Sequence, residues 1–125
     1  MGVSFSYCDA SWNYSGFMQF RKALAKAIGL ELLEMENFEG AIENLSKPED
    51  FKYRSWKGVK DPLRWFLNHS DCDGYLSPST CAKVAPRIKE IISKWGKDDY
   101  DRQQAQELVK GMLKAVKLKK NFYFK

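Results

Sequence analysis

Two helix starts in the middle of the chain are specified by the same pair of residue types. Asp61-Pro62 and Ser77-Pro78 each place a capping side chain directly before a proline. Proline is favoured at the first helical position because the N–H that it lacks would have no partner there. Between the two pairs lies the polar stretch HSDCDG, residues 69–74. The chain is therefore expected to turn between two helices at this stretch.

Apolar residues recur at helical spacing on both sides of this turn. A helix is predicted over residues 15–28, with Ser15 as its N-cap. Two helices follow the cap–proline pairs, and Pro86 is expected to kink or divide the second because proline lacks an N–H. A last long helix is predicted to start at the acidic residues 98–101. The residues expected to be buried in these helices are Phe17, Phe20, Leu24, Ile28, Leu63, Phe66, Leu67, Val84, Ile88, Ile91, Ile92, Trp95, Ala105, Leu108, Val109, Met112 and Val116.

Strands are expected at the two ends of the sequence. Val3, Phe5 and Tyr7 alternate with small polar residues, a period typical of a strand with one buried face. Residues 121–125 are short, aromatic and strand-like. We expect these segments to form a small antiparallel pair. The predicted fold class is α+β, mainly helical, with residues 1–125 forming a single domain.

The length and composition are those of a folded, non-membrane protein. A chain of 125 residues buries roughly two-thirds of its unfolded surface, enough for one core. Its apolar runs are far shorter than the ~20 residues of a membrane helix, and no basic and apolar leader is visible. The three cysteines are an odd number, which favours reduced thiols. A cytoplasmic protein with no membrane partner is predicted.

Charge is divided between the two parts of the sequence. Residues 1–50 carry four Lys/Arg against eight Asp/Glu, whereas the remainder carries seventeen against eight. Seven of the acids lie within residues 31–50, which contain one lysine. Lys110, Lys114 and Lys117 are expected on the outer face of the last helix. Such runs are usually solvated faces, and the alternative is that they are docking surfaces for oppositely charged partners.

The polar turn partly fits a calcium-binding EF-hand loop spanning residues 69–80. Asp71 and Asp73 would occupy positions three and five of that loop. His69 and Thr80 would occupy positions one and twelve, where carboxylates are normally required. The metal hypothesis therefore rests on His69, Asp71 and Asp73, which would bind calcium weakly.

Zinc is a second metal hypothesis for the same turn. His69, Cys72 and Cys81 have the spacing His-x2-Cys-x8-Cys, and Cys8 or an aspartate would have to supply a fourth ligand. The favoured interpretation is a helix-to-helix turn, because Asp side chains bond nearby backbone donors and Gly74 supplies a positive φ. No cofactor is predicted beyond weak calcium or zinc.

Four motifs taken together suggest a family. They are WNYSGF at 12–17, NHSDCDG at 68–74, APR at 85–87 and DDYD at 98–101. In order and spacing the chain resembles a group of small bacterial or phage-borne proteins that has no assigned activity. The resemblance implies a cytoplasmic protein and transfers no catalytic residue. The lysine-rich end, 110–125, differs from that group, in which a more acidic sequence is expected.

The sequence favours a binding protein over an enzyme. It has one histidine and lacks the Gly-x-Ser-x-Gly, Walker and dinucleotide-binding motifs. We predict a non-enzymatic module that binds another protein or a second copy of itself, with the acidic residues 31–50 set against the lysine-rich end. One alternative is nucleic-acid binding through the basic C-terminal half, and the other is divalent-metal binding through residues 69–80. The aromatics expected to stack on bases are Tyr53, Trp56, Phe122 and Tyr123.

Overall fold

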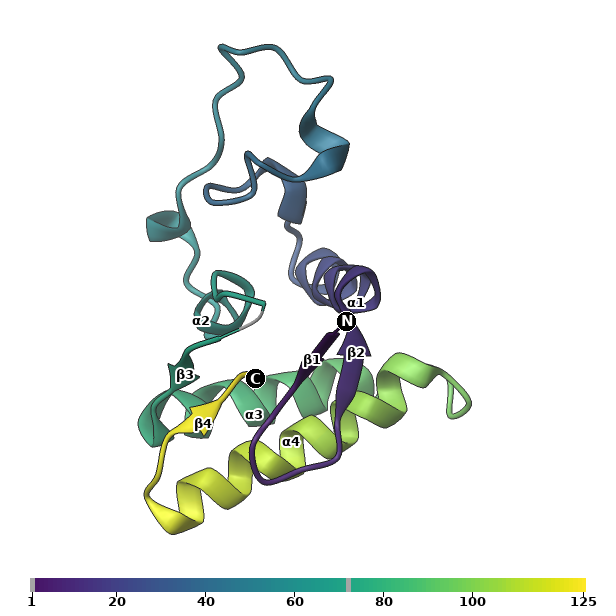
Figure 1. The fold of residues 1–125 in the computed structure, drawn as a ribbon, viewed down its shortest axis with the longest axis vertical. Helices are drawn as coiled ribbons and strands as arrows, with labels where there is room; N and C mark the ends of the chain where they lie inside the picture. The colour runs from purple at the N-terminus through teal and green to yellow at the C-terminus, as the bar shows by residue number, and fades with distance from the viewer. Residues whose placement is uncertain (1, 72) are drawn as a thin grey trace.

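The fold is a set of helices packed on two short strand ribbons, from which a lobe projects (Figure 1). The computed structural model describes residues 2–71 and 73–125. It is mainly helical with small antiparallel strand pairs, so the α+β fold class is confirmed. The elements in chain order are β1 (Gly2–Ser4), β2 (Ser11–Asn13), α1 (Tyr14–Ala27), η1 (Leu32–Glu34), η2 (Ile42–Asn44), η3 (Trp56–Gly58), α2 (Arg64–Leu67), β3 (Tyr75–Leu76), α3 (Pro78–Ile92), α4 (Tyr100–Leu118) and β4 (Phe122–Tyr123), where η denotes a 3-10 helix.

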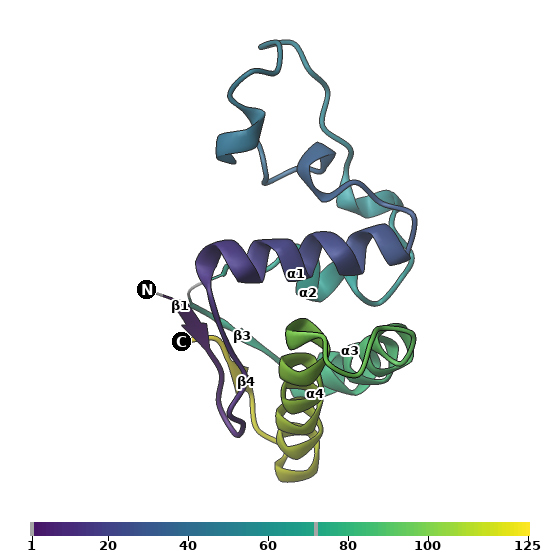
Figure 2. The ribbon, with the colours of Figure 1, turned by 90° about the vertical axis from the view of Figure 1, so that its right-hand side faces the viewer.

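The two terminal segments lie side by side, as the sequence predicted. Phe5 and Phe124 form an antiparallel bridge. Ser4 and Lys125 exchange two backbone hydrogen bonds on the same side, with N–O distances of 3.1 and 2.8 Å. Each segment also has a second partner that the sequence did not indicate, since β1 pairs with β2 and β4 pairs with β3. Figures 1 and 2 both show the N- and C-termini close together.

Aromatic rings fill the space between these ribbons and the helices. The Phe5 ring stacks on Phe122 at 5.6 Å and meets Phe124 edge-on at 5.1 Å. Trp12 stacks on Phe20 of α1 at 4.5 Å. Such pairs add stabilisation beyond their buried area. The helix stripes join this core largely as predicted, except that Ile28, Trp95 and Val116 are only partly buried.

Of the three caps predicted from the sequence, only Ser77 caps its helix. Asp61 accepts a hydrogen bond from Leu63 N at 3.0 Å, but α2 begins later, at Arg64, with Leu63 as its N-cap. Ser77 accepts a hydrogen bond from Thr80 N at 3.2 Å, and Asp99 caps α4 in the same manner. The prediction that Ser15 caps the first helix is wrong, because Asn13 accepts the bond from Gly16 N. β2 ends at Asn13 and α1 begins at the next residue, so Ser15 already lies in the first turn.

Pro86 does not divide its helix. α3 runs from Pro78 to Ile92 without interruption and contains Pro86, although a kink or two short helices was expected. Val84, Ala85 and Ile88 around the proline are fully buried, and α3 packs along α4. This packing stabilises a helical path that proline alone disfavours, because tertiary contacts supply most of the stability of a protein helix.

Residues 30–60 form the projecting lobe, which lies at one end of the molecule's longest axis (Figures 1 and 2). The lobe has little regular structure beyond η1, η2 and η3. A bridge between Met35 and Arg54 joins its two arms, and Trp56 Nε1 donates to Glu36 O at 2.8 Å. The acidic segment 31–50 is therefore displayed away from the helical body.

The terminal strand contact generates a stability prediction. Phe124 is 3% exposed and Tyr123, the preceding residue, is 45% exposed. We expect Phe124→Ala to lower the free energy of unfolding by about 3–5 kcal/mol because it empties a core site. Tyr123→Ala, the matched control at the neighbouring position, should cost about 1 kcal/mol or less. Urea unfolding followed by tryptophan fluorescence measures both, and equal effects would contradict the packing described above.

Candidate functional site

His69, the first residue of the predicted metal loop, is held by the protein on several sides. Its Nδ1 lies 2.9 Å from Ser70 O and its Nε2 lies 3.0 Å from Tyr75 O. Its ring stacks on Phe124 with centroids 4.0 Å apart. A Cβ at Gly74, where φ is +91°, would lie 3.1 Å from the His69 ring. The ring therefore braces the turn against the C-terminal segment, and both nitrogens have carbonyl neighbours.

Of the other metal candidates that the structure describes, Asp71 lines a hollow against α1 that His69 also lines, and Asp73 and Cys81 do not line it. Asp73 is exposed. Cys72 lies outside the described residues. Cys81 is fully buried in α3, and burial raises the pKa of its thiol to about 12. Within residues 2–71 and 73–125 no three His, Cys, Asp or Glu side chains are grouped so as to hold a metal ion.

Arg21 is a buried residue near this turn that the sequence analysis missed. It is 3% exposed, and its guanidinium donates to His69 O at 2.7 Å and Leu67 O at 3.3 Å. The guanidinium carbon lies 4.8 Å from the centre of the Phe17 ring. Burial lowers the pKa of Arg21 to about 10, and the charge of Asp71 opposes this shift by raising the pKa. The side chain remains charged at neutral pH and ties the turn to α1.

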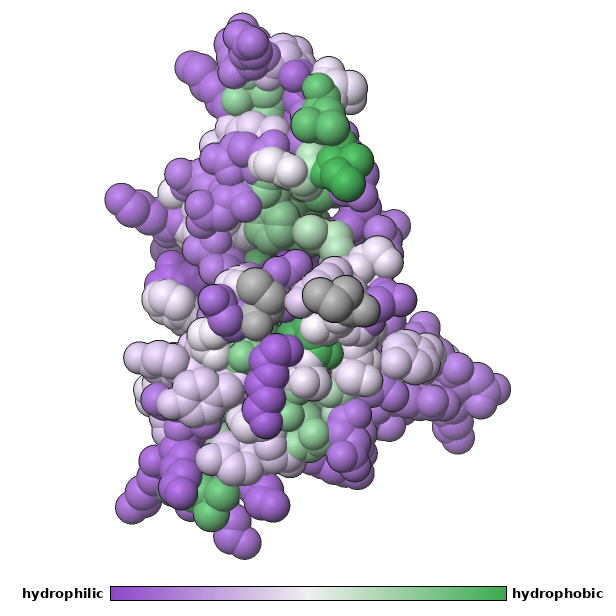
Figure 3. All heavy atoms as spheres, in the orientation of Figure 1, coloured by the Kyte–Doolittle hydropathy of each residue, from purple (hydrophilic) through white to green (hydrophobic). Residues whose placement is uncertain are grey.

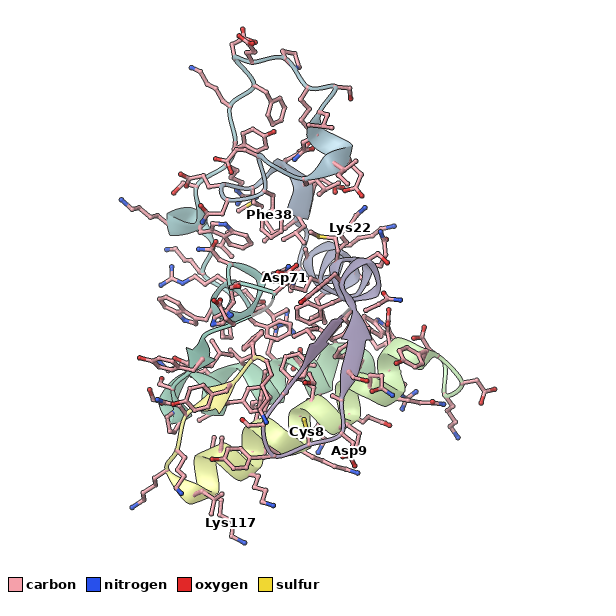
Figure 4. All side chains as sticks on the ribbon, viewed as in Figure 1. Cys8, Asp9, Lys22, Phe38, Asp71 and Lys117 are labelled. Carbon is pink, nitrogen blue, oxygen red and sulfur yellow. The ribbon has the colours of Figure 1, made fainter. Side chains whose placement is uncertain are left out.

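The hollow beside Arg21 has a volume of about 380 Å³. Met18 and Arg21 border it from α1, Phe38 borders it from the lobe, and Asp71 borders it from the turn. Figure 4 shows Asp71 below Phe38 in this region. Within the described part of the chain, Arg21 Nε has no hydrogen-bond partner. The only sequence signal for Arg21 was its place one turn after Phe17, on the apolar face of α1.

The three predicted lysines lie away from the turn. Lys110, Lys114 and Lys117 are all exposed on α4. Lys110 forms an ion pair with Glu107 at 2.9 Å. Lys117 is far from Asp71 in Figure 4. The predicted binding residues therefore belong to two separate regions, and only Lys110 borders a groove.

That groove runs between α3 and α4 and has a volume of about 470 Å³. Ile92 of α3 and Val109 and Leu113 of α4 form its apolar lining. Leu113 is 45% exposed, whereas Ile92 and Val109 are almost fully covered. The basic side chains that border it are Lys89, Arg102 and Lys110. We call this feature the α3–α4 groove, and no acidic side chain is among its described lining residues.

The lobe carries apolar surface of its own. Ile42 is 81% exposed and Leu45 is 77% exposed, the largest exposures among the large hydrophobic residues described. In Figure 3 the lobe shows a green patch among purple, hydrophilic side chains. Isolated exposed aliphatics are ordinary, but two of them three residues apart form a small patch. The acidic charge of this segment is evident in the sequence, whereas the exposure of its apolar pair is not.

No protein-family model, curated protein or solved structure matches this chain. The resemblance suggested by the four sequence motifs therefore stays a prediction. None of the helices in the described residues combines the length and the apolar character needed to cross a bilayer.

The bracing role of His69 can be separated from a metal-binding role. In the presence of a chelator, we expect His69→Ala to lower the free energy of unfolding by about 1–3 kcal/mol, because carbonyl and ring contacts are lost. Asp73→Ala, in the same turn but exposed, should change it by about 0.5 kcal/mol or less. Thermal unfolding with chelator, calcium or zinc measures both variants. A loss of stability that appears only when metal is present, and that is equal in both variants, would favour the metal hypothesis.

Proposed function

We propose that this protein is a non-enzymatic interaction module whose α3–α4 groove binds an acidic, amphipathic segment of a protein partner. The observation that carries the proposal is the composition of the groove. Its apolar lining consists of Ile92, Val109 and Leu113, of which Leu113 is exposed for direct contact, and basic side chains border it. Apolar grooves between helices commonly take a segment with aliphatic anchors at helical spacing. The basic border selects a segment that also carries Asp or Glu.

The electrostatics of the groove support this choice of ligand. Lys89 and Lys110 have long side chains, which can cover apolar surface while their ammonium groups stay in water. Complementary charge mainly sets association rate and specificity, whereas apolar anchors supply most of the affinity. Leu113 is the exposed member of the apolar lining, so it is the residue expected to contact an anchor directly.

A peptide-display selection on the intact protein tests the proposal. Random peptides selected on the wild type should be enriched in sequences that combine Asp or Glu with aliphatic residues three or four positions apart. Leu113→Glu should abolish this enrichment, because it places a carboxylate among the anchors. Leu118→Glu is the matched control, since Leu118 is 44% exposed on the same helix but does not line the groove.

The affinities of individual selected peptides for the wild type and the two variants are then measured. We expect Leu113→Glu to weaken them by roughly tenfold or more, equivalent to about 1.4 kcal/mol, while Leu118→Glu leaves them unchanged. Basic or uncharged consensus peptides, or equal effects of the two variants, would overturn the proposal.

A second candidate function, nucleic-acid binding, is favoured by one observation. Tyr75 and Tyr123 are register partners on the exposed face of the β3–β4 ribbon, with ring centroids 5.8 Å apart. Exposed aromatic rings stack on unpaired bases, and the basic end of the chain would add phosphate contacts. Two of the four predicted stacking residues are excluded as surface contacts, because Trp56 and Phe122 are buried in the core.

This candidate predicts binding of a single-stranded oligonucleotide that weakens steeply as salt rises. Replacing both Tyr75 and Tyr123 with alanine should reduce affinity by at least about fivefold, since each stacked base contributes about 1–3 kcal/mol. Tyr100→Ala is the control, because Tyr100 is similarly exposed at the opposite end of α4. Fluorescence anisotropy measures the affinity, and no binding at about 0.05 M salt would exclude this function.

A further inference from the structure

We infer that the acidic segment bound by the α3–α4 groove is the lobe of a second copy of this chain. The inference rests on the proposed function and names the partner of the same groove. Ile42 and Leu45 serve as the two apolar anchors, and they enter the groove beside Leu113. The chain thus carries both halves of one interface, the acidic apolar patch and the basic apolar groove.

The lobe presents its anchors in an ordered form. Asn44 lies between them in sequence and is buried, and its Nδ2 donates to Leu33 O at 2.8 Å and to Phe38 O at 2.7 Å. These bonds fix η2 on the inner side of the lobe, which leaves Ile42 and Leu45 on the outer side. An anchor that is already ordered loses less conformational entropy when it binds. The buried Asn44 therefore gives the exposed pair a defined geometry.

Charge complementarity identifies the occupant as this segment. Residues 31–50 carry seven acids and one lysine, and Glu43 lies between the two anchors in sequence. The charged side chains that border the groove are Lys89, Arg102 and Lys110, all of them basic. Glu107 pairs with Lys110 at an exposed site, where an ion pair is weak enough to be exchanged. The lobe therefore carries the charge opposite to that of the groove border.

The contact must form between molecules. The lobe and the α3–α4 pair lie at opposite ends of the molecule in both ribbon views (Figures 1 and 2). A lobe therefore cannot reach the groove of its own chain. Because each chain carries one lobe and one groove, association either closes as a two-fold dimer in which each lobe enters the partner's groove, or continues into a ring or an open chain.

Two surface variants of the full chain test this arrangement. Ile42→Ser combined with Leu45→Ser removes the anchors and leaves the groove intact. Leu113→Glu blocks the groove and leaves the anchors intact. Sedimentation velocity over a concentration series up to about 1 mM measures the mass, because an interface with two anchors is expected to be weak. The wild type should associate progressively, and less so at about 0.5 M salt than at about 0.05 M salt.

Mixing the two variants gives the decisive result. Each variant alone should self-associate at least about tenfold more weakly than the wild type. It should therefore stay monomeric at concentrations where the wild type associates. The mixture should form a one-to-one complex and nothing larger, because only one anchor pair and one groove remain. Leu118→Glu should associate like the wild type. Circular dichroism on each variant confirms that the fold is retained.

Three results would overturn the inference. They are a wild type that is monomeric throughout the series, association that survives in either variant, and variants that fail to recombine. If the wild type is monomeric while acidic peptides selected on the groove still bind, the inference fails and the proposed function stands. If the wild type is monomeric and no acidic peptide binds the groove, the inference and the proposed function both fail.

Discussion

The contact between the two terminal segments positions most of the other features of this protein. The Phe5–Phe124 bridge places β1 beside β4, and the Phe5, Phe122 and Phe124 rings close the core beneath them. β4 follows α4 after a few residues, so this contact also fixes the end of that helix. On its other side, Phe124 carries the His69 ring. One aromatic cluster thereby connects the ends of the chain, the polar turn and the helix pair that forms the groove.

The polar turn shows how residues suited to metal chemistry serve in structure. His69 is braced by backbone carbonyls and by Phe124, and the buried guanidinium of Arg21 binds the His69 and Leu67 carbonyls from α1. A buried charge is tolerated when hydrogen bonds and ring faces replace part of its hydration. The turn is thus attached to two elements that are distant in sequence. This attachment accounts for the placement of His69 and for the burial of Arg21.

The exposed apolar residues of the two proposed binding surfaces, Leu113, Ile42 and Leu45, lie outside the core, whereas Ile92 and Val109 of the groove belong to it. The α3–α4 groove exists because two packed helices leave a channel along their outer seam, and Leu113 remains exposed in it. The lobe has few regular elements, yet Asn44 and the bridge between Met35 and Arg54 give it a defined shape. Opposite charge on lobe and groove follows from the uneven distribution of acids and bases along the sequence. The surfaces are therefore complementary in both charge and apolar character.

The sequence by itself determined the helix cap at Ser77, the acidic start of α4, the helical stripes, the pairing of the terminal strands and the division of charge. Caps, stripes and charge runs are encoded within a few neighbouring residues, and the strand pairing followed from alternation at both ends. Only the tertiary structure decided that Arg21 is buried, that Ile42 and Leu45 are exposed and that Leu113 lines a groove. Apolar spacing predicts which face of an element is buried, but it does not identify the elements that cover that face. Burial and groove formation depend on contacts between segments far apart in sequence, which no local pattern specifies.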